Sequence, residues 1–176
     1  IERQIHLSSD SILFDSNSSG HQLSPCFVFH QHDGIPKTLS YASLRKCLIL
    51  HRKWLLKTIN AKIIDCRSDT VDDIVVAYIS GNSPDMLLSV LACSSPESIP
   101  AIPALLNTRW TPLERIASLR SRKKHTNISS AGRNVVTIVL HDDSAPFRDA
   151  ACQVANGLAQ TDHQYACYLP IPTFSE

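Results

Sequence analysis

The segment from Val71 to Leu119 constrains the fold most, because strand, turn, helix, strand and helix signals follow one another in it without interruption. Its first run, Asp73 to Ile79, is β-branched and almost wholly apolar, as a parallel strand covered on both faces requires. Ile99 to Leu106 is a second short apolar run and predicts the next strand. The segment reads as one βαβα unit, and it predicts an α/β domain whose mainly parallel sheet is flanked by helices.

Two helices are predicted inside this segment by their start signals. Ser83 stands at the N-cap position, with Pro84 as the first helical residue. Thr111 and Glu114 have the spacing of a capping box for the second helix. The faces expected to be buried are Leu87, Leu88 and Leu91 in the first helix and Leu113, Ile116 and Leu119 in the second. Because the first helix joins the two strands, those strands are expected to be parallel neighbours.

The rest of the chain supplies further elements on both sides. Residues 1–25 are polar, serine-rich and without period, so we expect an irregular lead-in. Asp33-Gly34 lies between the apolar runs Cys26 to His30 and Lys37 to Leu39, which predicts a hairpin. Ser40 is expected to cap a long helix with the apolar stripe Tyr41, Leu44, Leu48, Leu55 and Ile59. Downstream we expect a loop (Arg120 to Ala131), a strand (Val135 to Leu140), a helix (Phe147, Ala151, Val154, Leu158) and a last strand (Tyr165 to Ile171).

Composition fits a soluble globular domain, with 43% hydrophobic and 19% charged residues. The net charge of +1 predicts no nucleic-acid partner, and no apolar run is long enough to span a membrane. Residues 1–20 do not have the shape of a signal peptide, so the expected location is the cytosol or an organelle matrix. The six cysteines are scattered and are expected to be reduced: Cys26, Cys47, Cys66, Cys93, Cys152 and Cys167. The sequence predicts no oligomeric state.

Three stretches carry a resemblance: TLSYASL (Thr38 to Leu44), VDDIVVAYISGNSPDMLLSVLAC (Val71 to Cys93) and IPALLNTRWTPLE (Ile102 to Glu114). They look like the opening segments of the AMP-forming acyl-activating enzymes, the superfamily of acyl-CoA synthetases, peptide-synthetase adenylation domains and luciferases. Two positions depart from the family pattern. Ser43 stands where the family usually has Glu, and Cys93 to Ser98 replaces a Gly-Ala pair.

The resemblance implies that residues 26–176 form the N-terminal part of an acyl-CoA synthetase-like adenylate-forming domain, truncated before its ATP phosphate loop. Such a parent is an acid-thiol ligase that joins a carboxylic acid to ATP and then to CoA, with Mg²⁺. The sequence LLNTRWTP most resembles that of the CoA ligases of the fatty-acid type. The five glycines (Gly20, Gly34, Gly81, Gly132, Gly157) are too far apart to form a phosphate cradle. We therefore expect no catalytic residue and no bound cofactor in this chain, and its start at Ile1, with Met86 the only methionine, agrees with a fragment.

Several local clusters have a possible chemical role, and each also has a simpler structural interpretation that we favour. His30, His32 and Asp33 offer metal ligands, but a strand running into a turn also places them on one face. His163 and Cys167 are a weaker pair, so no metal site is predicted. Basic Arg120 to His125 suits a helix C-terminus.

Four further patterns also have both a chemical and a simpler structural interpretation. Asp142-Asp143 follows a strand, where α/β proteins bind ligands, but we favour acids at a helix start. Asn107, Arg109 and Trp110 end a strand beside a potential cleft, and a capped loop with a packed Trp is favoured. Gly81-Asn82-Ser83 lacks the second glycine of a nucleophile elbow. Asn17 and Asn127 begin glycosylation sequons that matter only in a secreted chain.

Two other functional classes remain open beside the ligase fragment. The chain fits a non-catalytic α/β binding or interaction module, and it also fits a degenerate remnant without independent function. The coding sequence after Glu176 separates them, because a Ser/Thr/Gly-rich loop with Pro-Lys there identifies an adenylating parent.

Overall fold

The structure, a computed structural model, describes residues 25–30, 36–66, 71–81, 83–94, 101–122, 134–162 and 165–173. The chain divides into two compact units, residues 1–47 and residues 48–176, which are described separately. In chain order the elements are β1 (Pro25–His30), β2 (Pro36–Ser40), α1 (Tyr41–Asp65), β3 (Asp73–Ile79), α2 (Pro84–Ser94), β4 (Ile102–Leu105), α3 (Pro112–Arg122), β5 (Val135–His141), α4 (Ala145–Asp162) and β6 (Tyr165–Pro170).

The first unit contains an antiparallel strand pair and the start of a helix. β1 pairs with β2, with Val28 opposite Thr38 and an irregularity between Pro25 and Phe27. The predicted hairpin is thus confirmed in its strands, while its turn lies outside the described residues. Ser40 caps α1 as predicted, because its hydroxyl accepts a hydrogen bond from the Ser43 N–H at 3.2 Å.

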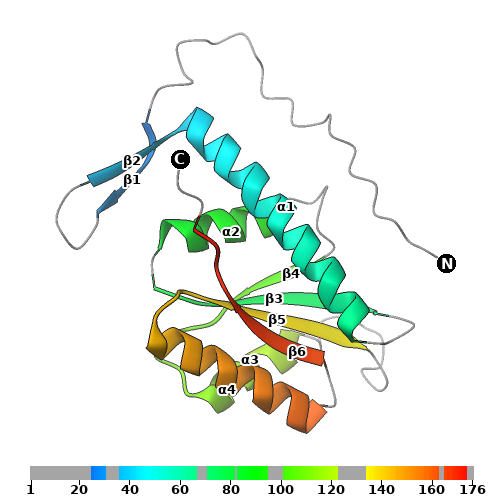
Figure 1. Ribbon diagram of the computed structural model, residues 1–176. Helices are drawn as coiled ribbons and strands as arrows, with labels where there is room; N and C mark the ends of the chain where they lie inside the picture. The colour runs from blue at the N-terminus through cyan, green and yellow to red at the C-terminus, as the bar shows by residue number, and fades with distance from the viewer. Residues whose placement is uncertain are drawn as a thin grey trace. The chain divides into compact units, whose positions relative to one another are not determined.

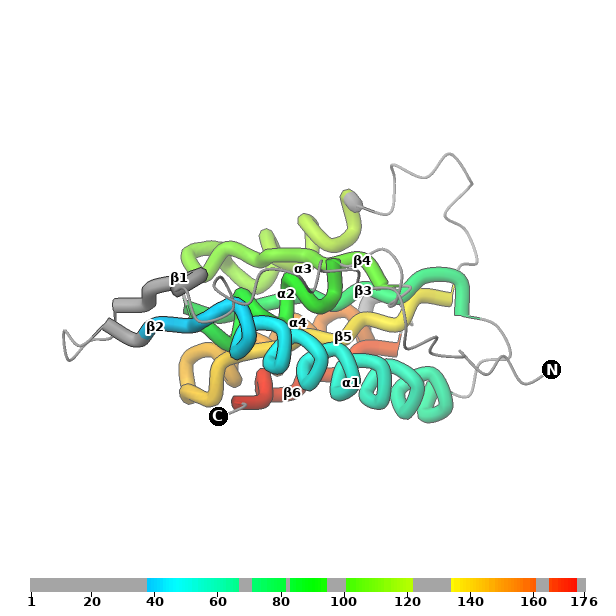
Figure 2. The backbone as a smooth tube through the Cα atoms, turned by 90° about the horizontal axis from the view of Figure 1, so that it is seen from above, coloured from blue at the N-terminus to red at the C-terminus, as the bar shows by residue number. Residues whose placement is uncertain are grey.

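The second unit is built on a four-stranded sheet in the order β4-β3-β5-β6. Figure 2 shows the strands in this order, and all three neighbouring pairs are parallel. Ala77 in β3 lies opposite Ala104 on one side and opposite Val139 on the other. The predicted strand Asp73 to Ile79 and its parallel pairing with the next strand through α2 are therefore confirmed.

Helices cover both faces of this sheet, and each face encloses its own part of the core (Figure 1). On one face Leu55 and Ile59 of α1 and Cys93 of α2 pack against Val76 and Ile138. On the other face α3 and α4 pack against Val75, Ala77 and Ile79, with Ile116, Leu119, Val154 and Leu158 as their main contributions. The α/β class with a parallel sheet flanked by helices follows directly from strands that are apolar on both sides.

The chain steps across the sheet first toward one edge and then toward the other, while its strands remain parallel. From β3 the chain steps to β4 through α2 on one face, and then returns past β3 to β5 through α3 on the other face. A reversal of direction combined with a change of face keeps the hand of the crossover constant. The result is a doubly wound sheet in which β3 and β5 are central.

Some sequence predictions for the apolar faces were wrong. Leu113 is 78% exposed, Tyr41 50% and Leu91 39%. In α2 the buried face instead consists of Leu88, Ser89, Ala92 and Cys93, because small residues allow the helix to approach the sheet closely. The start of the predicted loop at Arg120 was also wrong, since α3 continues to Arg122.

The second predicted strand is shorter and less buried than expected. It covers Ile102–Leu105 rather than Ile99 to Leu106, and residues 95–100 lie outside the described residues. Ile102 and Leu105 are 47% and 55% exposed, because β4 is the outer strand of the described sheet. Apolar content alone therefore does not distinguish a central strand from an edge strand.

We expect substitutions of Gly157 in α4 and Ile116 in α3 to have non-additive effects on the free energy of unfolding. A Cβ at Gly157 overlaps the Cδ1 of Ile116, while the Cγ1 stays at 3.7 Å. Gly157→Ala should therefore gain nothing in the free energy of unfolding when Ile116 is intact. In an Ile116→Val background, which lacks Cδ1, the same change should stabilise by about 0.5–1 kcal/mol through helix propensity. Urea denaturation of the wild type, the two single variants and the double variant measures these free energies of unfolding. Additive effects of the two substitutions would contradict the close packing.

Candidate functional site at the carboxyl ends of β3 and β5

The carboxyl ends of β3 and β5 bring two polar segments of the chain together. The strands are parallel neighbours, with Ile79 opposite His141, so Ser80 and Asp142 follow at the same edge of the sheet. The chain leaves β3 by α2 on one face and β5 by α4 on the other. In open α/β sheets such a crossover point is where ligands usually bind. This crossover point is therefore the candidate functional site of the chain.

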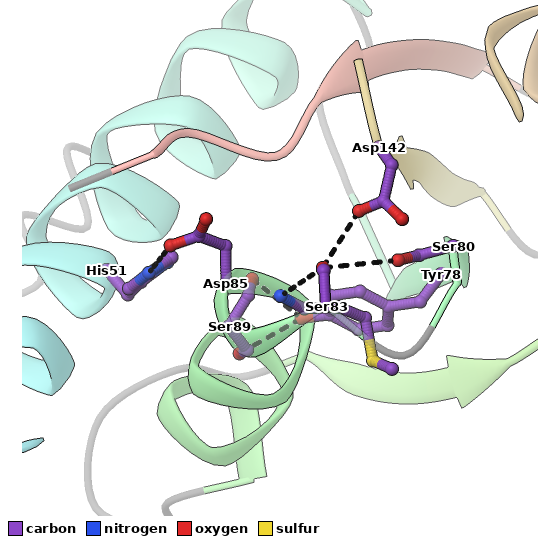
Figure 3. A network of polar contacts seen from close by, with 8 residues as sticks. His51, Tyr78, Ser80, Ser83, Asp85, Ser89 and Asp142 are labelled. Carbon is purple, nitrogen blue, oxygen red and sulfur yellow. Dashed lines mark hydrogen bonds and ion pairs between the residues drawn. The ribbon is translucent and has the colours of Figure 1, made fainter. Parts of the chain in front are cut away.

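Asp142 joins the two polar segments at this crossover point, and Figure 3 shows its contact with Ser83. Its Oδ2 accepts a hydrogen bond from the Gly81 N–H at 2.8 Å, and its Oδ1 accepts one from the Ser83 hydroxyl at 2.9 Å. The favoured interpretation of Asp142 as an acid at the start of its own helix was wrong. Its carboxylate bonds instead to the segment that follows the neighbouring strand.

Ser83 serves two partners at once. Its hydroxyl oxygen accepts the Met86 N–H at 3.1 Å, which confirms the predicted cap of α2, while its hydrogen goes to Asp142. The hydroxyl of Ser80 donates to the Gly81 carbonyl at 2.8 Å and lies 3.5 Å from the Ser83 hydroxyl. Ser83 is thus held by its neighbours in a capping role. Among the described residues, the partners of the Ser83 hydroxyl are Ser80, Met86 and Asp142, and none of them is a histidine.

A buried polar contact lies behind the crossover point, between β3 and α2. The Tyr78 hydroxyl donates to the Ser89 carbonyl at 3.1 Å and accepts from the Ser89 hydroxyl at 3.3 Å. Burial raises the pKa of Tyr78 well above its ordinary value, and it raises the pKa of the neighbouring Cys93 thiol to about 11. Both groups are therefore neutral at physiological pH and serve to join the helix to the strand.

A second carboxylate stands in the first turn of α2. Asp85 Oδ1 lies 3.8 Å from Nε2 of His51, which is fully buried on α1, so the two form an ion pair when the histidine is protonated (Figure 3). Acidic groups at a helix start complement the exposed N–H groups there. The start of α2 thus has carboxylates from two different parts of the chain near it.

The loop between β4 and α3 is held by its own hydrogen bonds. The buried guanidinium of Arg115 donates to the carbonyls of Asn107 and Thr108 at 3.2 and 2.7 Å, and its desolvation lowers the pKa of Arg115. The Asn107 side chain accepts the Arg109 N–H at 2.9 Å. The predicted capping box is confirmed, because Glu114 accepts from the Thr111 N–H and hydroxyl, which also lowers the pKa of Glu114.

The hydrogen bond between Asn107 and Arg109 agrees with the interpretation of Asn107 as part of a capped loop, to which Arg109 contributes its backbone N–H. Trp110 is 37% exposed, so it is packed only in part. The contacts of Arg115 were missed in the sequence, since an arginine in a helix gives no local sign that it will turn back onto the preceding loop.

Most of the remaining candidate residues lie outside the described part of the chain. The side chains of His30, His32, Asp33 and His163 lie outside the described residues, as do Asn17, Asn127 and most of Arg120 to His125. Within the described part of the chain, no three His, Cys, Asp or Glu side chains are placed to hold a metal ion. Among the cysteines of that part, Cys66, Cys93, Cys152 and Cys167 are free thiols. None of the described helices is long and apolar enough to cross a membrane.

Comparison with known proteins gives a distant structural likeness. Searches of protein-family models and of curated proteins find no match. Among solved structures, an acyl-CoA synthetase of Brucella canis matches 90% of this chain at 14% sequence identity and a TM-score of 0.49. The match covers 23% of that protein, so the chain spans less than a quarter of its length. A likeness this distant says nothing about substrate or catalytic residues.

We expect alkaline pH to weaken the contact between β3 and α2 through Cys93. Its thiol has an ordinary pKa of 9.0 and a folded pKa of about 11, so between these values the unfolded chain releases a proton that the folded chain retains. The free energy of unfolding should therefore fall as pH rises from 9 to 11. Denaturation at several pH values should show a shallower decline for Cys93→Ala, with the remainder due to the other groups whose pKa burial raises, among them Tyr78 and Cys167. An identical slope in both proteins would contradict the burial of the thiol.

Proposed function

We propose that this chain forms the N-terminal α/β part of an AMP-forming acyl-activating enzyme of the acyl-CoA synthetase type. The proposal rests on the three motif-like stretches of the sequence and on where they lie. Leu39, Ser40 and Tyr41 lie at the junction of β2 and α1, and Asn107 to Thr111 join β4 to α3. The observation that carries the proposal is the start of α2, where Ser83 caps the helix and Pro84 begins it, as in the Ser-Pro part of the family's Asn-Ser-Pro motif.

The parent reaction has two steps. A carboxylate attacks ATP to give an acyl-adenylate and pyrophosphate, and the CoA thiol then displaces AMP to give a thioester. The first step needs donors and Mg²⁺ arranged around the triphosphate. ATP, Mg²⁺, CoA and a fatty-acid-like carboxylic acid are accordingly proposed as ligands of the full-length parent.

The described residues do not fit the triphosphate, so no catalytic step is assigned to them. The Gly81 N–H donates to Asp142 rather than pointing to an open cradle, and Gly157 lies inside α4. A phosphate loop needs several converging backbone N–H groups. The role proposed for this chain is structural: it builds a doubly covered sheet on which the rest of an adenylating enzyme is assembled.

We expect the purified 176-residue chain to show no carboxylate-dependent ATP–pyrophosphate exchange, because its glycines form no phosphate cradle. The assay should use saturated fatty acids of several lengths, with a complete acyl-CoA synthetase as positive control. Exchange above the blank would overturn this expectation.

The parent itself is tested by reading the coding sequence beyond the Glu176 codon and expressing the protein that it encodes. A Ser/Thr/Gly-rich loop with Pro-Lys, together with exchange activity of the longer protein, is the expected result. A stop codon at that position, or a longer protein without exchange activity, would contradict the ligase and favour a binding module or a remnant.

A further inference from the structure

The contact between Asp142 and the start of α2 has a role that goes beyond the proposed function. We propose that the Asp142 carboxylate is a latch: it fastens the end of β5 to the start of α2 and so keeps the crossover point of the sheet closed. The latch consists of two hydrogen bonds, one from each carboxylate oxygen, to Gly81 and to Ser83. The partners are 61 and 59 residues away in sequence, so the contact is entirely tertiary.

The chemistry of the contact suits a carboxylate and no other side chain of that size. Both partners are donors, the Gly81 N–H and the Ser83 O–H, and a carboxylate accepts one bond on each oxygen. Ser83 in turn accepts the Met86 N–H of the first turn of α2. Through the Ser83 hydroxyl, the negative charge of Asp142 is thus placed near the partial positive charge of the helix start, which it complements. Bonds to a charged acceptor are stronger than bonds between neutral groups.

Gly81 lies close to both Asp142 and Phe147, with room for no more than an ordinary van der Waals contact. A Cβ at Gly81 would lie 3.6 Å from Oδ2 of Asp142 and 3.8 Å from the ring of Phe147 in the first turn of α4. The segment after β3 therefore lies directly against both the end of β5 and the start of α4. A shift of Asp142 away from this place releases the donors of Gly81 and Ser83 at once, because both bonds end on one carboxylate.

While the latch is closed, these donors are used inside the chain. The crossover point, which in other open α/β sheets receives a ligand, is occupied here by the protein's own carboxylate. The start of α2 becomes available to anything else only when Asp142 leaves. Asp142 is thus a positioning residue for α2, and the closed state is the one in the structure.

Backbone amide exchange measured by NMR on the whole chain tests the latch. In Asp142→Ala the amides of Gly81 and Met86 should exchange about tenfold to hundredfold faster than in the wild type, because one loses its acceptor and the other its fixed cap. Amides in the middle of the sheet, such as those of Ala77 and Val139, should keep their wild-type rates. Asp143→Ala is the matched control, since it removes the same charge from the exposed neighbouring residue; its Gly81 and Met86 rates should stay at the wild-type level.

Asp142→Asn provides the second variant, because it keeps the size of the side chain and replaces one acceptor oxygen by a donor. It should raise the amide exchange rates of Gly81 and Met86 by about tenfold without affecting those of the strands. If Asp142→Ala does not fold, the rates in Asp142→Asn test the latch alone. Wild-type rates at Gly81 and Met86 in both folded variants would overturn the latch. Equal acceleration in Asp143→Ala would overturn it as well, since the effect would then come from net charge.

Discussion

The burial of β3 on both faces is the constraint on which the second unit depends. Val76, Ala77 and Ile79 are completely buried, although Val76 points to one helix layer and Ala77 and Ile79 to the other. A strand of this kind is unstable unless helices cover both sides and a neighbouring strand pairs with each edge. β5 meets the same requirement, with all seven of its residues buried. The two central strands therefore determine where every other element of this unit is placed.

The polar chemistry of the unit is a consequence of this arrangement. Because the strands are almost wholly apolar, polar side chains gather mainly where the strands end, and parallel neighbours end at the same edge. Asp142 meets Gly81 and Ser83 there, and Asp85 lies near His51 on the α1 side. Each of these carboxylates is used to position a helix start. The arrangement accounts for a stable junction between two crossovers without any reaction being assigned to it.

Local signals in the sequence were sufficient for the elements that they govern. The β-branched run of β3, the Ser83 cap with Pro84, and the Thr111–Glu114 capping box depend on residues a few positions apart, and all were predicted correctly. Long-range features were not accessible in this way. The order β4-β3-β5-β6 decides that Leu105 is exposed at an edge and that Asp142 faces Ser83, and no local pattern contains that order. The exposure of Leu113 has the same origin, because a helix face is buried only where another element lies against it.

The central position of β3 is tested most directly by nuclear Overhauser contacts across this strand in the isotope-labelled chain. A central parallel strand predicts backbone contacts from Ala77 to the neighbourhood of Ala104 on one side and of Val139 on the other. These contacts should have the spacing of parallel pairs, without the short Hα–Hα distances of antiparallel ones. Contacts from β3 to one strand only, or an antiparallel pattern with β5, would contradict the doubly wound sheet and with it the meeting of Asp142, Gly81 and Ser83.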